Sequence, residues 1–381
     1  MKLPHKSHPV YSKPGKVYIV VNQNKRRCLE GAIEQSGFIA NLNNKWQKSG
    51  KPKENFRIAI KPNIMTAAFE TDISVYTDPA LVEHLIERIR EEGYRDITVV
   101  ESHNVWGVYY EGRTVESVAD MVGYSRNGYA LVDLTLTRVP HDYGDNELGK
   151  HVVGPAWRDA DYRISFAKNK THWQCYYTGC LKNIYGCLPE MNKMKSYHGH
   201  RREFHSCTIL IHEAFPVDFA FLDAYWSGDG FAGHVRDNHP NKTNTIICGE
   251  NCFAVDWAQG EKMGLDPRKN YVIRRAEERW GPIEIERISD MTPYPNWENL
   301  PPFVDTLTNL IEEIYGVSYF FSRTLAYRMD ARYKEVKKLR WLFRIIRFPV
   351  KLFDDHAQGI LIVLILILAI GFLLGRLKLK I

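Results

Sequence analysis

The first 285 residues contain two patterns of hydrophobic positions. Short apolar runs of strand length recur at 16–21, 57–61, 96–101, 129–134, 161–166, 217–224 and 244–249. Between some of them, residues 79–92, 114–122 and 252–263 show helical periodicity; Leu81, Leu85 and Ile89, for example, fall on one helical face. Strands that alternate with helices predict an α/β fold, with a mainly parallel sheet covered by helices on both faces.

The C-terminal part follows a different pattern. Residues Gly359–Gly375 read GILIVLILILAIGFLLG, without a charged residue, Pro, Asn or Gln. As a helix this run is about 25 Å long at 1.5 Å per residue, the short end of a bilayer span. Apolar flanking residues extend it, and the pattern predicts a transmembrane helix over 357–377. The alternative is a buried core helix, although such a helix rarely lacks a polar face.

The segment before this run is strongly basic. From 336 to 351, apolar residues recur at alternating spacings of three and four, and basic residues follow the same spacing one position later. This pattern predicts an amphipathic helix over 323–352 that lies at a membrane surface and faces anionic lipid headgroups. Packing of that helix on the protein's own body is the alternative.

Net charge supports the same division of the chain. The whole chain carries +6, residues 323–381 carry +9, and residues 1–322 therefore carry −3. A mildly acidic body argues against a nucleic-acid partner. The basic flank predicts a single-pass membrane protein whose body faces the cytoplasm, and residues 1–21 lack the apolar region of a signal peptide. An odd number of cysteines in that compartment argues against a disulfide framework.

We therefore expect five regions. They are an N-terminal strand and helix segment (1–55), the main α/β domain (56–285), an irregular and helical wrap (286–322), the basic interfacial helix (323–352) and the transmembrane helix (357–377).

Polar clusters follow four of the expected strands. They are Lys61-Pro62-Asn63, Glu101-Ser102-His103-Asn104, Lys168–His172, and Asp223 with the glycine-rich stretch to Gly230. Ligands of such folds bind outside the carboxyl ends of the strands, so a shared pocket is expected there.

These residues also carry a family resemblance. Lys168, Lys170, Thr171 and His172, followed by Gly179, Lys182, Asn183 and Gly186, form the elements Lys-x-Lys-Thr-His and Gly-x-x-Lys-Asn-x-x-Gly. Over about residues 55–285 the chain resembles the domain-of-unknown-function 362 family. The resemblance implies no defined activity. Many members of that family carry ferredoxin-type modules, whereas this chain has an apolar C-terminal run instead.

Residue chemistry suggests an anion site. Lysines suit a carboxylate or phosphate ligand, and asparagines add oriented hydrogen bonds. The expected substrate-binding residues are Lys61, Asn63, Lys168, Lys170, Lys182 and Asn183. His172 would be the acid or base, and Asp223 its orienting carboxylate or a metal ligand. The alternative is that these lysines are solvated, or pair structurally with Glu101, Asp223 and Glu190.

A second hypothesis concerns metal. His198, His200 and His205 lie within eight residues and could bind zinc or iron together with Asp223 or Asp229, although the spacing matches no known motif. The cysteine spacing does not match ferredoxin motifs, which argues against an iron–sulfur cluster. Phosphate-binding loop and dinucleotide-binding glycine motifs are absent from the sequence.

The sequence thus favours a membrane-anchored enzyme acting on an anionic small molecule, with the reaction undefined. The alternative is a non-catalytic, membrane-tethered scaffold, or an accessory protein that passes a metal or electrons to a partner.

Overall fold

A computed structural model describes residues 3–67, 70–104, 110–172, 174–198, 202–230, 240–301 and 334–335. Its centre is a nine-stranded sheet, ordered β12-β1-β11-β10-β8-β2-β3-β5, with β9 paired to β8. The strands are β1 (Gly15–Val21), β2 (Ile58–Pro62), β3 (Ile97–Glu101), β5 (Ala130–Asp133), β8 (Tyr162–His172), β9 (Tyr176–Thr178), β10 (Phe219–Gly228), β11 (Thr245–Gly249) and β12 (Ile285–Ile288).

The strands of the central part, β10, β8, β2, β3 and β5, are parallel to one another. On one side β11 runs antiparallel to both β10 and β1. The α/β class is therefore confirmed, but the sheet is mixed, and its parallel part is the centre.

Strand order reverses in the middle of this parallel part. The chain forms β2, moves outward through β3 and β5, and then returns to the opposite side of β2 to form β8 and β10. The β2–β8 boundary is therefore a topological switch point, where the connections leaving neighbouring strands diverge and leave space for a ligand.

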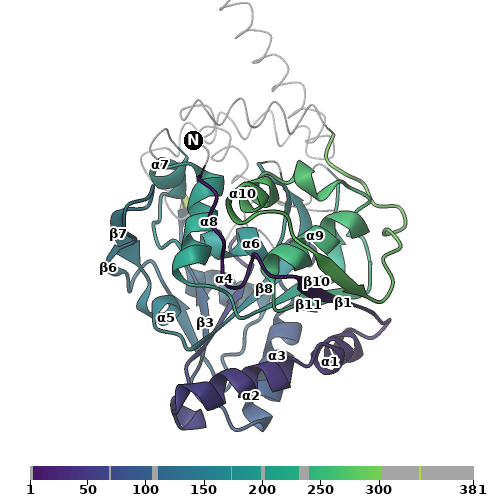
Figure 1. Cartoon of the computed structure of the whole chain (residues 1–381). Coiled ribbons are helices and arrows are strands. Elements are labelled where there is room, and N and C mark those ends of the chain that lie inside the picture. Colours follow the sequence, from purple (N-terminus) through teal and green to yellow (C-terminus); the bar gives the residue numbers. More distant parts are fainter. Residues whose placement is uncertain are drawn as a thin grey trace, which may run out of the picture.

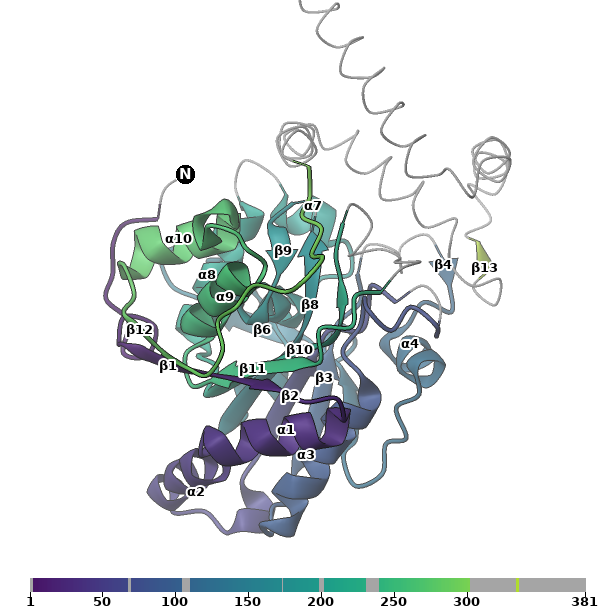
Figure 2. The ribbon, with the colours of Figure 1, turned by 90° about the vertical axis from the view of Figure 1, so that its right-hand side faces the viewer.

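Helices cover both faces, which makes three layers (Figures 1 and 2). One layer contains α1 (Lys25–Gln35), α2 (Phe38–Ser49), α3 (Pro79–Glu91) and α4 (Val115–Val122), and the other contains α6 (Cys180–Asn183), α8 (Phe204–Ala214), α9 (Cys252–Lys262) and α10 (Tyr271–Trp280). The side chains of β2 point alternately to the two faces of the sheet, and both faces are apolar. Ile58 and Ile60 pack in one core, and Ala59 packs in the other.

Smaller elements complete the body. They are β4 (Tyr110–Glu111), β6 (Val139–Asp142), β7 (Lys150–Val153), α5 (Pro155–Arg158) and α7 (Lys193–Tyr197), with the 3-10 turns η1 (Lys53–Asn55), η3 (Ile184–Cys187) and η4 (Pro267–Lys269).

Two elements differ from the sequence prediction. The segment Lys168–His172 was expected to follow a strand, but it is the second half of β8 and pairs with β9. No helix was predicted around His205, yet this residue lies in the first turn of α8. That helix is buried along its whole first half, so it has no polar face to reveal its period.

Among the residues that the structure describes, no helix is long and apolar enough to cross a membrane. The expected transmembrane helix over 357–377 lies outside those residues. Of the expected interfacial helix over 323–352, only Lys334–Glu335 is described, as the two-residue strand β13 paired with β4.

Candidate functional site

The expected lysines and their partners lie on neighbouring strands around the switch point. Lys61 is near the end of β2, Lys168 and Lys170 are on β8, and Asp223 is on β10. Each of these four side chains is almost fully buried. The four belong to two groups, because alternate residues of a strand point to opposite faces of the sheet.

The first group is centred on Lys61. Its ammonium lies 2.9 Å from Glu101 Oε2 and also donates to Asn183 Oδ1 at 3.3 Å. Asn183 in turn donates from Nδ2 to the Lys61 carbonyl at 2.6 Å. The Asn183 amide therefore holds both ends of Lys61 and ties the end of β2 to the short helix α6.

Gly186 is required by this packing. A β-carbon at position 186 would lie 2.5 Å from Lys61 Cε and 2.9 Å from Glu101 Oε1. Either distance is far below van der Waals contact, so only glycine fits here without moving the ion pair. This accounts for the last glycine of the Gly-x-x-Lys-Asn-x-x-Gly element.

The second group begins with a buried ion pair. Lys168 Nζ lies 2.8 Å from Asp223 Oδ2, and neither side chain reaches solvent. The same carboxylate also accepts backbone N–H bonds from Asp78 at 3.0 Å and from Tyr225 at 3.1 Å. Asp223 was expected to orient His172, but it bonds a lysine and two backbone amides instead, and these bonds fix the start of α3 against β10.

Lys170 has a different environment. Its ammonium donates to Asn63 Oδ1 at 3.3 Å, Thr66 Oγ1 at 2.6 Å and the Val75 carbonyl at 2.5 Å. All three acceptors are uncharged. Burial, followed by the nearby charges of Lys182, Lys168 and Lys61, lowers the pKa of Lys170 well below its usual value.

Lys182 stands on α6 beside these groups. Its ammonium is 5.6 Å from the centre of the Phe204 ring and 5.9 Å from that of Tyr185. Both distances are within the range of cation–π attraction.

Lys193, which sequence reasoning did not include, joins the first group. It donates to Ser102 Oγ at 2.9 Å and to the Leu188 carbonyl, and is buried. Burial is the main cause that lowers its pKa to about 7, while the charge of Glu101 opposes the shift. The segment around Lys193 has no strand or helix pattern, so nothing in the sequence indicated that it folds back onto β3.

Asp256, on α9, fixes the position of α6. Its carboxylate accepts the backbone N–H groups of Cys180 at 2.5 Å and Leu181 at 2.9 Å, at the start of that helix. Burial raises the pKa of Asp256 to about 7. A β-carbon at Gly179 would lie 2.5 Å from both carboxylate oxygens, which explains the first glycine of the same element.

Two histidines lie at this edge. His172 ends β8, and its Nδ1 accepts the backbone N–H of Gln174 at 3.1 Å. His103 follows β3, with Nε2 at 2.7 Å from Asp133 Oδ2 at the end of β5. Neither ring nitrogen of His103 makes a well-aligned hydrogen bond with the described residues, although both are buried. At this edge, His103 is therefore the histidine that lies beside a carboxylate, that of Asp133.

The proposed metal ligands are not brought together in the described part of the chain. His198 Nε2 bonds the Tyr185 hydroxyl at 3.1 Å, and its ring stacks on Phe204. His205 contacts Glu203 and, through Nε2, the Gln174 carbonyl at 3.0 Å. His200 lies outside the described residues. Within those residues, no three His, Cys, Asp or Glu side chains are grouped as metal ligands.

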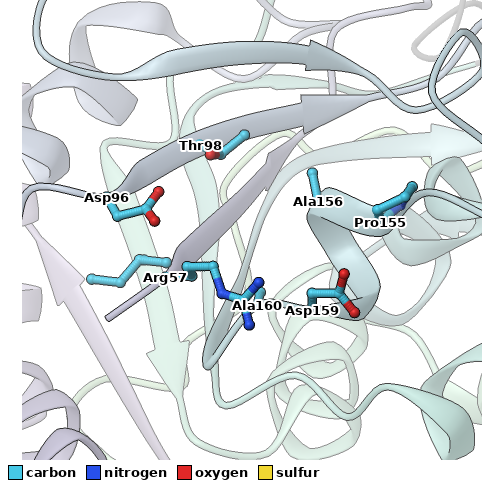
Figure 3. A pocket seen from close by; sticks show the side chains of 8 residues that line it. Arg57, Asp96, Thr98, Pro155, Ala156, Asp159 and Ala160 are labelled. Atoms are coloured by element: carbon cyan, nitrogen blue, oxygen red, sulfur yellow. The ribbon is translucent and has the colours of Figure 1, made fainter. Parts of the chain in front are cut away.

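The opposite edge of the same strands contains a small open hollow of about 190 Å³. Arg57, Asp96 and Asp159 line it, together with α5 (Figure 3). It faces the amino ends of β2 and β3 and contains none of the residues predicted for the site.

Comparison with known proteins gives one similar sequence and one weakly similar solved structure. The chain is 24% identical to the "Thylakoid-associated protein sll1697" of Synechocystis over 236 residues, which are 60% of this chain and 69% of that protein. Among solved structures, the lactate racemase apoprotein from Thermoanaerobacterium thermosaccharolyticum aligns with 11% identity and a TM-score of 0.36. That alignment covers 73% of this chain but only 61% of the racemase.

A family model described as domain of unknown function (DUF362) matches residues 58–260. This range runs from β2 to α9 and includes Lys61, Lys170, Asn183 and Asp256. Because the match extends over more than half of the chain, the protein belongs to the DUF362 family.

Proposed function

We propose that this protein is a membrane-anchored enzyme that binds a small carboxylate or phosphate compound at the carboxyl edge of its parallel strands. The observation that carries the proposal is the excess of buried lysines at the topological switch point. Lys61 and Lys168 are matched by Glu101 and Asp223, whereas Lys170 has only neutral acceptors. An anionic ligand would supply the missing negative charge.

The proposed roles follow from position. Lys170 and Lys182 bind the anion, while Lys61, Lys168, Asn63 and Asn183 hold the lysine network in place. His103 is the preferred acid or base. The Asp133 carboxylate lies 2.7 Å from its Nε2, and its buried ring makes no well-aligned hydrogen bond with the described residues. His172, further along β8, is the second candidate.

Membrane anchoring is supported by the sequence alone. The uncharged run over 359–375 and its basic flank have the length and charge expected of a span with a cytoplasmic body. The Synechocystis relative is named as thylakoid-associated, which agrees with a membrane location.

Thermal unfolding of the full-length protein in mild detergent tests the anion site. Phosphate or sulfate should raise the melting temperature in a concentration-dependent way, following RT ln(1 + [L]/Kd), and should do so more than zinc. Lys170→Met should abolish the rise, and His198→Gln should preserve it. Copurification of stoichiometric zinc or iron that is lost with His205→Gln would replace this proposal with a metalloprotein.

Membrane extraction tests the anchor. The full chain should resist a carbonate wash and require detergent, whereas a variant ending at Gly316 should fractionate without it. A variant ending at Lys351 should bind anionic vesicles and dissociate at high salt. Removal of the full chain by carbonate would overturn the spanning helix.

A further inference from the structure

Lys170 is the buried lysine whose charge is least compensated. Its ammonium donates hydrogen bonds to an amide oxygen, a hydroxyl and a carbonyl. Lys61 and Lys168, on the same edge, each contact a carboxylate within 2.9 Å. A buried ammonium without a counter-ion is costly, so at this position the neutral amine is favoured.

The neighbouring charges act in the same direction. The three largest charge effects on the pKa of Lys170 come from Lys182, Lys168 and Lys61, and each of them disfavours a fourth cation. Lys193 differs, because Glu101 is the strongest charge acting on it and favours its protonated form. Of these lysines, Lys170 is therefore the one best suited to present a free electron pair.

A neutral amine beside fixed ammonium groups is suited to carbonyl chemistry. Amines that are desolvated and placed next to another cation act as nucleophiles toward carbonyl compounds. The neighbouring ammonium groups, in turn, suit the carboxylate of the same molecule.

We propose that Lys170 forms a Schiff base with a small 2-oxo acid, whose carboxylate is bound by the neighbouring lysines. The inference rests on the proposed function, since it names the substrate class of the same site. The Lys170 nitrogen attacks the carbonyl carbon, and the carbonyl oxygen leaves as water with the two amine protons. A carbon–nitrogen double bond replaces the carbon–oxygen double bond, and no oxidant or reductant is consumed.

The acceptors of Lys170 indicate how the substrate enters. Asn63, Thr66 and Val75 all belong to the connection between β2 and α3, which covers the amine. Their three neutral hydrogen bonds are the ones that the substrate must replace. Asp78 anchors the end of this connection through its N–H bond to Asp223, so displacement is confined to the part before it.

Reductive trapping tests the inference with the full-length protein in mild detergent. Pyruvate and cyanoborohydride should add one group per chain, with the mass of pyruvic acid less one oxygen atom, and peptide mapping should place it on Lys170. Lys170→Arg should lose the adduct. Lys262→Met should retain it, because Lys262 is also buried and bonds carbonyls, but those of Asp290 and Thr292, and its ammonium lies over the Tyr294 ring.

Several outcomes separate this inference from the proposed function. Adducts on Lys193, or only on exposed lysines, would overturn the assignment of Lys170, and mapping on the native chain decides this even if a variant misfolds. Stabilisation by phosphate without an adduct would overturn the Schiff base and leave the anion site standing. Absence of both stabilisation and adduct would overturn both. Phosphate that slows trapping would support a single site.

Discussion

Both ends of the central parallel strands contain lysine–carboxylate ion pairs, but the pairs are exposed to solvent at one end and buried at the other. At the amino ends, Lys45 pairs with Asp218 and Lys51 with Asp161, and these lysines are 49% and 36% exposed. At the carboxyl ends, the Lys61–Glu101 and Lys168–Asp223 pairs are at most 4% exposed. Exposed pairs contribute about 0–1 kcal/mol, whereas buried pairs carry a desolvation cost that can exceed their attraction.

This difference indicates which end is functional. The amino-end pairs hold the connections that precede each strand. Asp218, for example, also accepts the backbone N–H of Arg163 at 2.8 Å. Nothing in folding requires lysines to be buried at the other end, where apolar residues would pack as well. Their presence there is better explained by a ligand whose charge they complement.

The largest expected effect comes from breaking a carboxyl-end pair. Asp223→Asn leaves Lys168 as a buried, unpaired charge and should lower the free energy of unfolding by about 3–5 kcal/mol. Lys45→Met, at the amino end, should cost less than about 1 kcal/mol. Urea unfolding of both variants measures the contrast, and equal losses would remove the distinction between the two ends.

A smaller effect is expected from crowding the Lys61–Glu101 pair. Gly186→Ala places a methyl group 2.5 Å from Lys61 Cε, so the pair must shift, at a cost of about 1–3 kcal/mol. It should also weaken sulfate binding. Gly144→Ala is the matched control: its φ of 84° strains any other residue by about 1 kcal/mol, but no atom lies within 4 Å. If Gly186→Ala kept full sulfate affinity, the Lys61–Glu101 pair would have no role in anion binding.

The pH dependence of stability tests Lys193. Its pKa in the folded protein, about 7, is lower than the 10.5 of an unperturbed lysine, so between these values the unfolded chain binds more protons. Stability should therefore rise with pH across this window, with a slope of up to about 1.4 kcal/mol per pH unit from this group. Lys193→Met should reduce the slope by that amount. An unchanged slope would show that the ammonium of Lys193 remains charged when buried.

The smallest effect is expected at the histidine-rich segment. His198→Gln keeps a hydrogen-bonding group near the Tyr185 hydroxyl, and the rings of Tyr185 and Phe204 lie between position 198 and Lys182, so the change should alter stability by less than about 0.5 kcal/mol. Melting curves with and without sulfate should show the same shift as the unchanged protein. A large loss of the sulfate effect would extend the site to this segment.

Hydrophobic periodicity predicted the helices α3 and α4, which present one buried face, and short apolar runs predicted the central strands, which are buried on both faces. The helix α9 was also predicted, although nine of its eleven residues are buried. Periodicity did not reveal α8, whose first nine residues are all buried, nor the reversed direction of β11, which depends on long-range pairing. Lys61, Lys168 and Asp223 were expected together because polar residues followed apolar runs. Lys193 and Asp256 were missed, since their roles depend on tertiary contacts with Ser102 and α6.

Because β8 is long and carries Lys168, Lys170 and His172, the direction in which these side chains point depends on the register of this one strand. Lys168, Lys170 and His172 are two residues apart on this strand, whereas Ser165, Ala167 and Asn169 alternate with them and face the other layer. Insertion or deletion of one residue near Phe166 would exchange these two sets and turn every lysine of the strand toward the opposite layer. Substitutions can therefore tune this site one side chain at a time, but a change of length by one residue would remove it as a unit.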